Sequence, residues 1–272
     1  MNYKIIGWNI NQRSGMGENI PQFVIDELKA QGADIIVLTE LFKGETIEYF
    51  WKEMAKAGYG YSITQNNGTN EVGILWKEDI FSIGAVDDTV ITKKDNNNPN
   101  LLLVDLVDNV GQIITVVGFR IRMTEYDERV EELEIVLEKA NIKHNPIVMV
   151  CDCNNLRRET AVENWNLCVI DKLLLEKGFN RNTPKGQSIY SNISYGGYAY
   201  EFAEDHIITR GLSVDLGEYD RSFVYRDPIM YPWGKNFQIY DKKTGREMSI
   251  KPGFPDHAIV KGELVDNEVN GE

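Results

Sequence analysis

Short apolar runs alternate with polar, glycine-containing breaks along most of the chain. Residues 3–8, 34–38 and 147–150 are predicted to be strands, and the run at 34–38 is too short and too rich in β-branched residues to favour a helix. Other apolar runs are separated by Asn, Gly, Asp and Pro, as antiparallel strands with turns are. They span 61–64, 72–76, 101–107, 113–117, 207–208, 222–225 and 258–260.

Apolar residues recur at helical spacing in three other places. One helix is predicted between Pro21 and Gly32, because proline favours a first helical turn and glycine ends a helix. Two more are predicted over 46–57 and 130–140. Strands outnumber helices, and helices separate only some of them. This predicts an α/β fold of four layers, with two packed, mostly antiparallel sheets flanked by helices.

The chain is long enough for one large domain. Its 272 residues, 42% of them hydrophobic, can bury a sizeable core, and no repeat or linker divides them. We predict a single domain over 1–265 and a frayed acidic tail over 266–272.

The formal net charge of −13 argues against diffuse attraction of the whole surface to nucleic acid or anionic lipid. A polyanionic substrate must therefore be held locally. Three cysteines, Cys151, Cys153 and Cys168, are too few and too close for a disulfide framework. The amino-terminal residues do not resemble a secretion signal, and no apolar run is long enough for a membrane span. We expect a reduced, cytoplasmic protein without a membrane anchor, of undetermined oligomeric state.

Carboxylate, amide and imidazole side chains occur at or just beyond the ends of the predicted strands. A sheet-based enzyme gathers its catalytic groups at such positions, so these segments predict one metal-dependent phosphoester site. They are Trp8-Asn9, Glu40, Asp152-Cys153-Asn154, Glu204-Asp205-His206 and Asp256-His257.

Glu40 is the first candidate for a metal ligand. A carboxylate at the end of a buried strand is costly unless a cation or hydrogen-bond donors pair with it. A hard divalent cation held by carboxylate oxygens also stabilises the negative charge that gathers on a phosphate ester during hydrolysis. A strand-end acid that faces the solvent is an equally good interpretation of Glu40 alone.

Two pairs of residues are spaced by two, which places both members on one face of a strand. Asn9 and Asn11 can orient Glu40, a metal-bound water or the phosphate. Asp152 can accept a proton from water while Asn154 donates to a phosphate oxygen. Each asparagine taken alone is more typical of a turn.

His257 is the candidate proton acceptor or charge stabiliser, and a carboxylate such as Asp205 would set its tautomer. Asp256 would then approach the metal. His206 is a weaker candidate because it should face away from Asp205, and His144 lies in a loop between a helix and a strand.

The order of these segments resembles the endonuclease/exonuclease/phosphatase superfamily and its deoxyribonuclease-I-like fold. The resemblance spans nearly the whole chain, but each motif is only a few residues long. It is carried by Trp8-Asn9-Ile10-Asn11, Leu38-Thr39-Glu40, Cys151-Asp152-Cys153-Asn154, Asp205-His206-Ile207-Ile208 and Pro255-Asp256-His257.

The resemblance implies a four-layer αββα sandwich that uses Mg²⁺ or Mn²⁺ to cleave phosphoester bonds in nucleic acids, inositol phosphates, lipids or protein adducts. By the same resemblance Glu40 binds the metal with help from Asn9. Asp152 and Asn154 position the nucleophile and substrate, and Asp205 pairs with His257 beside Asp256.

Three positions depart from the family pattern. Arg120 stands where the family often has a histidine or tyrosine, Cys151 replaces a usual glycine, and Pro255 replaces a usual serine. An arginine can clamp a phosphate but cannot transfer protons near neutral pH. Further arginines near the segments predict a basic rim, with ordinary surface ion pairs as the alternative. They are Arg13, Arg122, Arg157, Arg158 and Arg210.

We rank three functional hypotheses. The first is a Mg²⁺-dependent phosphodiesterase that acts on nucleic acid, with DNA as the favoured substrate, by one-step attack of an activated water. The second is a phosphatase or phosphodiesterase of a small or lipid-derived phosphate, which the net acidity favours. The third is a binding protein that kept the fold and lost turnover. The fold alone does not choose among them.

Overall fold

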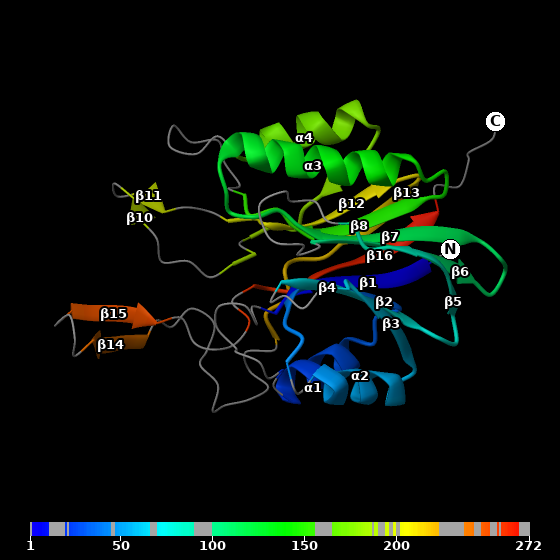
Figure 1. The fold of residues 1–272 in the computed structure, drawn as a ribbon, viewed down its shortest axis with the longest axis horizontal. Coiled ribbons are helices and arrows are strands. Elements are labelled where there is room, and N and C mark those ends of the chain that lie inside the picture. Colours follow the sequence, from blue (N-terminus) through cyan, green and yellow to red (C-terminus); the bar gives the residue numbers. More distant parts are fainter. Residues whose placement is uncertain are drawn as a thin grey trace.

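Two six-stranded sheets pack face to face, and helices cover the outer face of each, in the computed structural model (Figure 1). The four-layer αββα architecture predicted from the sequence is therefore confirmed. The structure describes residues 2–10, 20, 22–44, 47–65, 70–89, 100–155, 165–186, 188–189, 194–195, 198–199, 202–222, 237–241, 246–250, 255 and 257–266.

The first sheet has the strand order β13-β16-β1-β2-β4-β3. Only β1 and β2 are parallel neighbours in it, and the other pairs are antiparallel. Its strands are β1 (Asn2–Asn9), β2 (Ile35–Leu41), β3 (Tyr59–Ile63), β4 (Glu71–Lys77), β13 (Leu212–Leu216) and β16 (Val260–Asp266).

The second sheet has the order β5-β6-β7-β8-β12-β9, with β7 and β8 as its parallel pair. Its strands are β5 (Phe81–Asp87), β6 (Leu101–Asp108), β7 (Ile113–Arg120), β8 (Ile147–Asp152), β9 (Asn180–Asn182) and β12 (Asp205–Arg210). Two small hairpins pair β10 (Ser194–Tyr195) with β11 (Tyr198–Ala199) and β14 (Phe237–Asp241) with β15 (Arg246–Ile250).

Helices α1 (Gln22–Gln31) and α2 (Ile47–Lys56) cover the first sheet, and α3 (Tyr126–Asn141) and α4 (Leu167–Glu176) cover the second (Figure 1). The three interfaces between layers each contain a cluster of buried apolar side chains. Burial of this apolar surface supplies the main force that holds the layers together. No helix among the described residues is long and apolar enough to cross a membrane.

The structure confirms the three predicted helices and most of the predicted strands. It adds β5, whose side chains are largely exposed and so produce no apolar run. It also adds β13 and the apolar helix α4, whose continuous hydrophobic stretch has no clear period. The last strand begins at Val260 and continues to Asp266, which pairs with Leu212. Most of the predicted strand 222–225 lies outside the described residues.

Asp220 links helix α1, strand β16 and the chain at Ser222 by hydrogen bonds. Its carboxylate accepts hydrogen bonds from Gln31 Nε2 at 3.0 Å, Lys261 Nζ at 2.8 Å and the Ser222 backbone N–H at 2.8 Å. Burial alone would raise the pKa of Asp220, but these donors outweigh it and hold the pKa well below its usual range.

Replacement of Asp220 by asparagine should therefore lower stability in a pH-dependent way. We expect a loss of about 1–2 kcal/mol in the free energy of unfolding at neutral pH, because the three donors lose their charged acceptor. A lowered folded-state pKa stabilises the fold above the unfolded pKa of about 4, and this stabilisation is lost as the pH falls further. Urea unfolding of both proteins at several pH values measures the gap, and a gap that stays constant down to pH of about 3 would contradict the prediction.

Candidate active site

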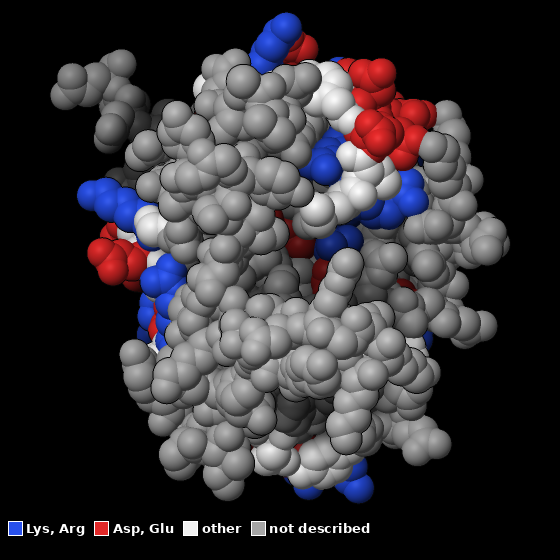
Figure 2. Space-filling model, turned by 90° about the vertical axis from the view of Figure 1, so that its left-hand side faces the viewer, with Lys and Arg blue, Asp and Glu red and all other residues white. Residues whose placement is uncertain are grey.

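Strand register brings three of the predicted site residues together at one end of three neighbouring strands in the second sheet. Asp152, the last residue of β8, lies opposite both Arg120 at the end of β7 and Asp205 at the start of β12. The parallel strands β1 and β2 end at the same side of the molecule and add Asn9 and Glu40. Figure 2 looks onto this end, where acidic and basic side chains lie together at the bottom of a hollow.

Asp152 is the centre of the hydrogen-bond network. Its side chain is buried and accepts from Asn9 Nδ2 at 2.9 Å and from Arg120 Nε at 3.1 Å, both on Oδ2. Its other oxygen, Oδ1, accepts from the backbone N–H of Asn154 at 2.9 Å. Donors from both sheets therefore fix the orientation of this carboxylate.

Arg120 connects Asp152 to Glu40. Its Nη2 lies 2.8 Å from Glu40 Oε1, and both side chains are buried. Burial alone would lower the pKa of the Arg120 guanidinium, but the carboxylates of Glu40, Asp152 and Glu204 raise it. The arginine is therefore charged inside the site.

Glu40 reaches the site because the backbone of β2 is irregular there. The pairing of β2 with β4 shifts register between Leu38 and Leu41, and Glu40 has a φ of 54°. A β-bulge of this kind re-aims a side chain, and a positive φ in a residue with a Cβ is strained.

His257 is held by both its backbone and its ring. Its carbonyl accepts from Trp8 Nε1 at 3.0 Å, and its Nδ1 lies 2.8 Å from Asp205 Oδ2. Nε2 lies 3.4 Å from the Asn9 amide Nδ2, which can only donate, so Nδ1 carries the proton in the neutral ring. Burial raises the pKa of the Asp205 carboxyl to about 6, against the opposing effect of His257.

Asn154 is close to Asp152 for a different reason from the one that the spacing predicted. It has a φ of 48°, which takes it out of the strand, and its amide Nδ2 donates to the Ile121 carbonyl at 2.6 Å. Arg129 Nη1 donates to the Asn154 carbonyl at 3.2 Å. The bond from its N–H to Asp152 is an Asx-type turn, so strand alternation does not bring these two residues together.

Two substitutions of Asn154 distinguish the contribution of its side-chain hydrogen bond to stability from the cost of its strained backbone. We expect Asn154→Ala to lower the free energy of unfolding by about 2–3 kcal/mol, because a buried carbonyl loses its donor and alanine is strained at positive φ. Asn154→Gly should recover about 1 kcal/mol of that loss, since glycine adopts this conformation readily. Urea unfolding measures both, and a glycine variant no more stable than the alanine variant would contradict the strain.

Seven of the nine predicted site residues are described, and all seven lie in this network. They are Asn9, Glu40, Arg120, Asp152, Asn154, Asp205 and His257. Asn11 and Asp256 lie outside the described residues. Their predicted roles, and the roles of the other seven, remain predictions.

The structure separates the weaker candidates from the site. His206 faces the helical side, where Thr183 Oγ1 lies 2.8 Å from Nδ1 and Asn155 Oδ1 lies 2.9 Å from Nε2. His144 lies on the exposed loop between α3 and β8. The predicted basic rim is wrong for Arg210, which pairs at the opposite end of β12 from Asp205. Arg13, Arg157 and Arg158 lie outside the described residues.

Glu204 belongs to one of the strand-end segments singled out in the sequence, but no role was predicted for it. It is buried beside Asp205, and its Oε2 lies 3.8 Å from His257 Nε2. Alternation along a strand would have placed it away from Asp205, but Glu204 precedes the first residue of β12. The orientation of its side chain is therefore set by the chain before the strand, and no signal in the sequence predicts this orientation.

The charges of the described residues at the site do not balance. Four buried carboxylates, on Glu40, Asp152, Glu204 and Asp205, face one guanidinium and one imidazole. Among the described residues, no group of three or more His, Cys, Asp and Glu side chains is arranged to hold a metal ion. The excess of carboxylate oxygens nevertheless fits a hard divalent cation, which such oxygens prefer.

The cysteines that flank Asp152 are part of the helical side of the second sheet. Cys151 and Cys153 are buried in the cluster under α3 and α4, with their sulfurs 3.3 Å apart, and all three cysteines are free. Burial raises the pKa of the Cys151 thiol well above its usual value, which makes it unreactive. The Cys151 position thus accommodates a side chain without disturbing Asp152.

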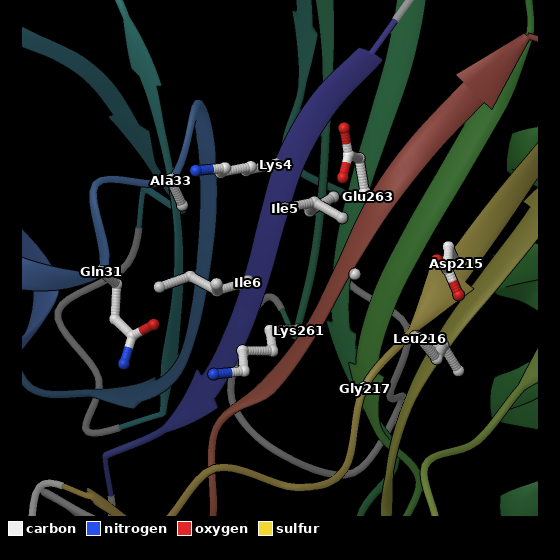
Figure 3. Close-up of a pocket in the computed structure, with 11 residues that line it drawn as sticks. Lys4, Ile5, Ile6, Gln31, Ala33, Asp215, Leu216, Gly217, Lys261 and Glu263 are labelled. Carbon is white, nitrogen blue, oxygen red and sulfur yellow. The ribbon is translucent and has the colours of Figure 1, made fainter.

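A cavity of about 300 Å³ lies elsewhere, on the outer face of the first sheet between α1 and β13 (Figure 3). Lys4, Gln31, Asp215 and Lys261 line it, together with apolar residues of β1. None of the predicted site residues is part of its lining, so it belongs to the scaffold.

No family model and no curated protein sequence matches the chain. Solved structures do. An endonuclease/exonuclease/phosphatase family protein from Bacteroides thetaiotaomicron superposes with a TM-score of 0.62 and 15% identity, over 98% of this chain and 98% of that one. The chain has the endonuclease/exonuclease/phosphatase fold. The resemblance that the motifs indicated is thus confirmed at the level of the fold.

Two other structures with this fold give the range of its chemistry. A mannosyl-6-phosphatase from Bacteroides thetaiotaomicron has a TM-score of 0.63 and 16% identity, over 97% of this chain and 99% of its own. D. rerio TDP2, complexed with a single-stranded DNA product, has a TM-score of 0.61 and 13% identity, with the same coverage. Identities this low show the shared fold and leave the substrate open.

Proposed function

We propose that the protein is a divalent-metal-dependent phosphoesterase that hydrolyses phosphodiester bonds, with nucleic acid as the first candidate substrate. One observation carries the proposal. Asn9, Arg120, Asp152, Asp205 and His257 form a single buried network at the end of both sheets of an endonuclease/exonuclease/phosphatase fold.

We assign to the Asp152 carboxylate the role of positioning the attacking water and accepting its proton. Three hydrogen-bond donors, from Asn9, Arg120 and Asn154, fix its orientation. A fixed carboxylate can hold a water in line with the phosphorus and take its proton. Asn154 acts through Asp152, because its amide already donates to the backbone of Ile121.

We assign to His257 the stabilisation of the negative charge that develops on the phosphate. Its Nδ1–H donates to Asp205, so the ring is held in one orientation with Nε2 toward Asn9. A protonated imidazole beside Asp205 stabilises an oxyanion and can return a proton to the leaving oxygen.

Arg120 supplies the direct contact to the phosphate in this proposal. Its Nε and Nη2 are paired with Asp152 and Glu40, while its buried Nη1 has no hydrogen-bond partner among the described residues. Buried donors are almost always satisfied, and a phosphate oxygen is the acceptor that a guanidinium binds most strongly. This contact binds phosphate without any proton transfer.

Glu40 and Asp256 are the residues that we propose as ligands of Mg²⁺ or Mn²⁺, with Asn9 beside them. The cation, when bound, neutralises charge on the phosphoryl oxygens. Glu40 is suited to this because the bulge in β2 directs its carboxylate into a site that already holds excess negative charge.

A small phosphate ester is the second candidate substrate. The net charge of −13 disfavours a large polyanionic substrate. The similar mannosyl-6-phosphatase is named for a small phosphate ester. The similar TDP2 structure, which contains a single-stranded DNA product, supports the nucleic acid instead.

A substrate panel tests the proposal. Single- and double-stranded DNA, RNA, inositol phosphates and a generic phosphodiester are each incubated with the protein in Mg²⁺ or Mn²⁺, and again in chelator. We expect hydrolysis of at least one class, abolished by chelator and restored when the cation is returned. The panel also includes the Asp152→Asn variant, which should be inactive. Absence of hydrolysis for every class, with normal cation binding, would leave a binding protein on this fold and overturn the proposal.

A further inference from the structure

Glu204 is the fourth buried carboxylate of the site, and it lies beside His257 Nε2, the ring nitrogen that faces away from Asp205. Its backbone is fixed on both sides, because its N–H donates to Ser188 Oγ at 2.7 Å and its carbonyl accepts from the Cys153 N–H at 2.7 Å. Its side chain is only 7% exposed, and Oε2 lies 3.8 Å from His257 Nε2. The carboxylate is therefore held in place beside the imidazole.

Glu204 also acts on Arg120 through its charge. Together with Glu40 and Asp152, it raises the pKa of the buried guanidinium. Of the two proposed phosphate contacts, His257 Nε2 lies 3.8 Å from Glu204 Oε2, and Arg120 is the other group on which the charge of Glu204 acts. Any anion that binds them must tolerate this charge.

We infer that Glu204 is a specificity-determining residue that favours phosphate diesters over terminal phosphate monoesters. The inference rests on the proposed function, because it assigns the phosphate to Arg120 and His257. A diester carries one negative charge near neutral pH, whereas a monoester carries nearly two above its second pKa of about 6. A second charge a few ångströms from a buried carboxylate costs enough affinity to change binding by about tenfold or more.

The experiment uses two small probes that differ by one methyl ester group and therefore by one negative charge. Dimethyl phosphate, a monoanion, and methyl phosphate, a dianion at a pH of about 8, are titrated onto the full chain in Mg²⁺ and followed by ³¹P NMR. Wild type should bind dimethyl phosphate more tightly. Glu204→Gln should bind methyl phosphate about tenfold more tightly than wild type, while its affinity for dimethyl phosphate stays within about twofold.

Two variants control for other effects. Glu204→Asp keeps the charge and should keep the preference for the diester. Glu48→Gln removes one negative charge at an exposed position on α2 and should change neither affinity. Equal shifts for both probes in Glu204→Gln, an unchanged affinity for methyl phosphate, or no binding of either probe to wild type would each overturn the inference.

These outcomes differ from failure of the proposed function. Binding is measured with no need for turnover, so the preference can follow Glu204 even if the wild type hydrolyses nothing. In that case the assignment of the phosphate subsite stands and the catalytic proposal falls. Hydrolysis of diesters and monoesters at equal rates, unchanged in Glu204→Gln, would leave the catalytic proposal and remove the role of Glu204.

Discussion

His257→Ala should lower the rate of phosphoester hydrolysis by about a thousandfold, within the usual range for loss of a positioned acid–base group. The imidazole is held between Asp205 on Nδ1 and the Asn9 amide near Nε2, so nothing else in the described network can replace it. We expect kcat to carry most of the loss, because the ring acts on charge that develops during the reaction. Initial rates on the most reactive member of the substrate panel measure the effect.

His144→Ala is the matched control, since the same substitution is made on the exposed loop between α3 and β8. It should have wild-type activity. A His257→Ala variant that folds normally and keeps more than about a tenth of the wild-type rate would remove His257 from the chemistry.

Arg120→Met should have the largest effect on stability. We expect the free energy of unfolding to fall by about 3–5 kcal/mol in the absence of divalent cations, because Glu40 and Asp152 would be left as buried, unpaired charges. The two contacts, at 2.8 Å and 3.1 Å, are made by side chains that are almost fully enclosed. Urea unfolding in chelator measures the loss.

Arg181→Met serves as the comparison. Arg181 also pairs with a carboxylate, but its partner Asp171 is 41% exposed, so we expect a loss of about 1 kcal/mol or less. If the two arginine variants lost the same amount, Arg120 would be an ordinary ion-pair residue and the central electrostatic argument would fail.

The sequence was informative about where strands end and less informative about how side chains turn there. Asp152 and Asp205 follow from the positions of the apolar runs, because the neighbouring strands β8 and β12 place them opposite each other. Asn9 ends a strand of the other sheet and reaches Asp152 through its side chain. The orientation of Glu40 depends on a register shift between β2 and β4, which is a long-range pairing that no local pattern encodes.

Arg120 and Asn154 show the same limit in two other ways. Arg120 was recognised as a departure from the family pattern, but its pairing with Glu40 joins strands of two different sheets. The spacing of Asn154 from Asp152 suggested strand alternation, yet the backbone forms a turn with positive φ that produces the same proximity. Residue type was thus predictable where geometry was not.

The most direct test of the proposed activity is the hydrolysis of a generic phosphodiester by the wild-type protein, first in chelator and then after Mg²⁺ is returned, beside Asp205→Asn. We predict no turnover in chelator, recovery with Mg²⁺, and little recovery in the variant, because asparagine no longer fixes His257. Turnover that persists in chelator, or an Asp205→Asn variant as active as wild type, would contradict the proposal that one metal-dependent site joins these residues.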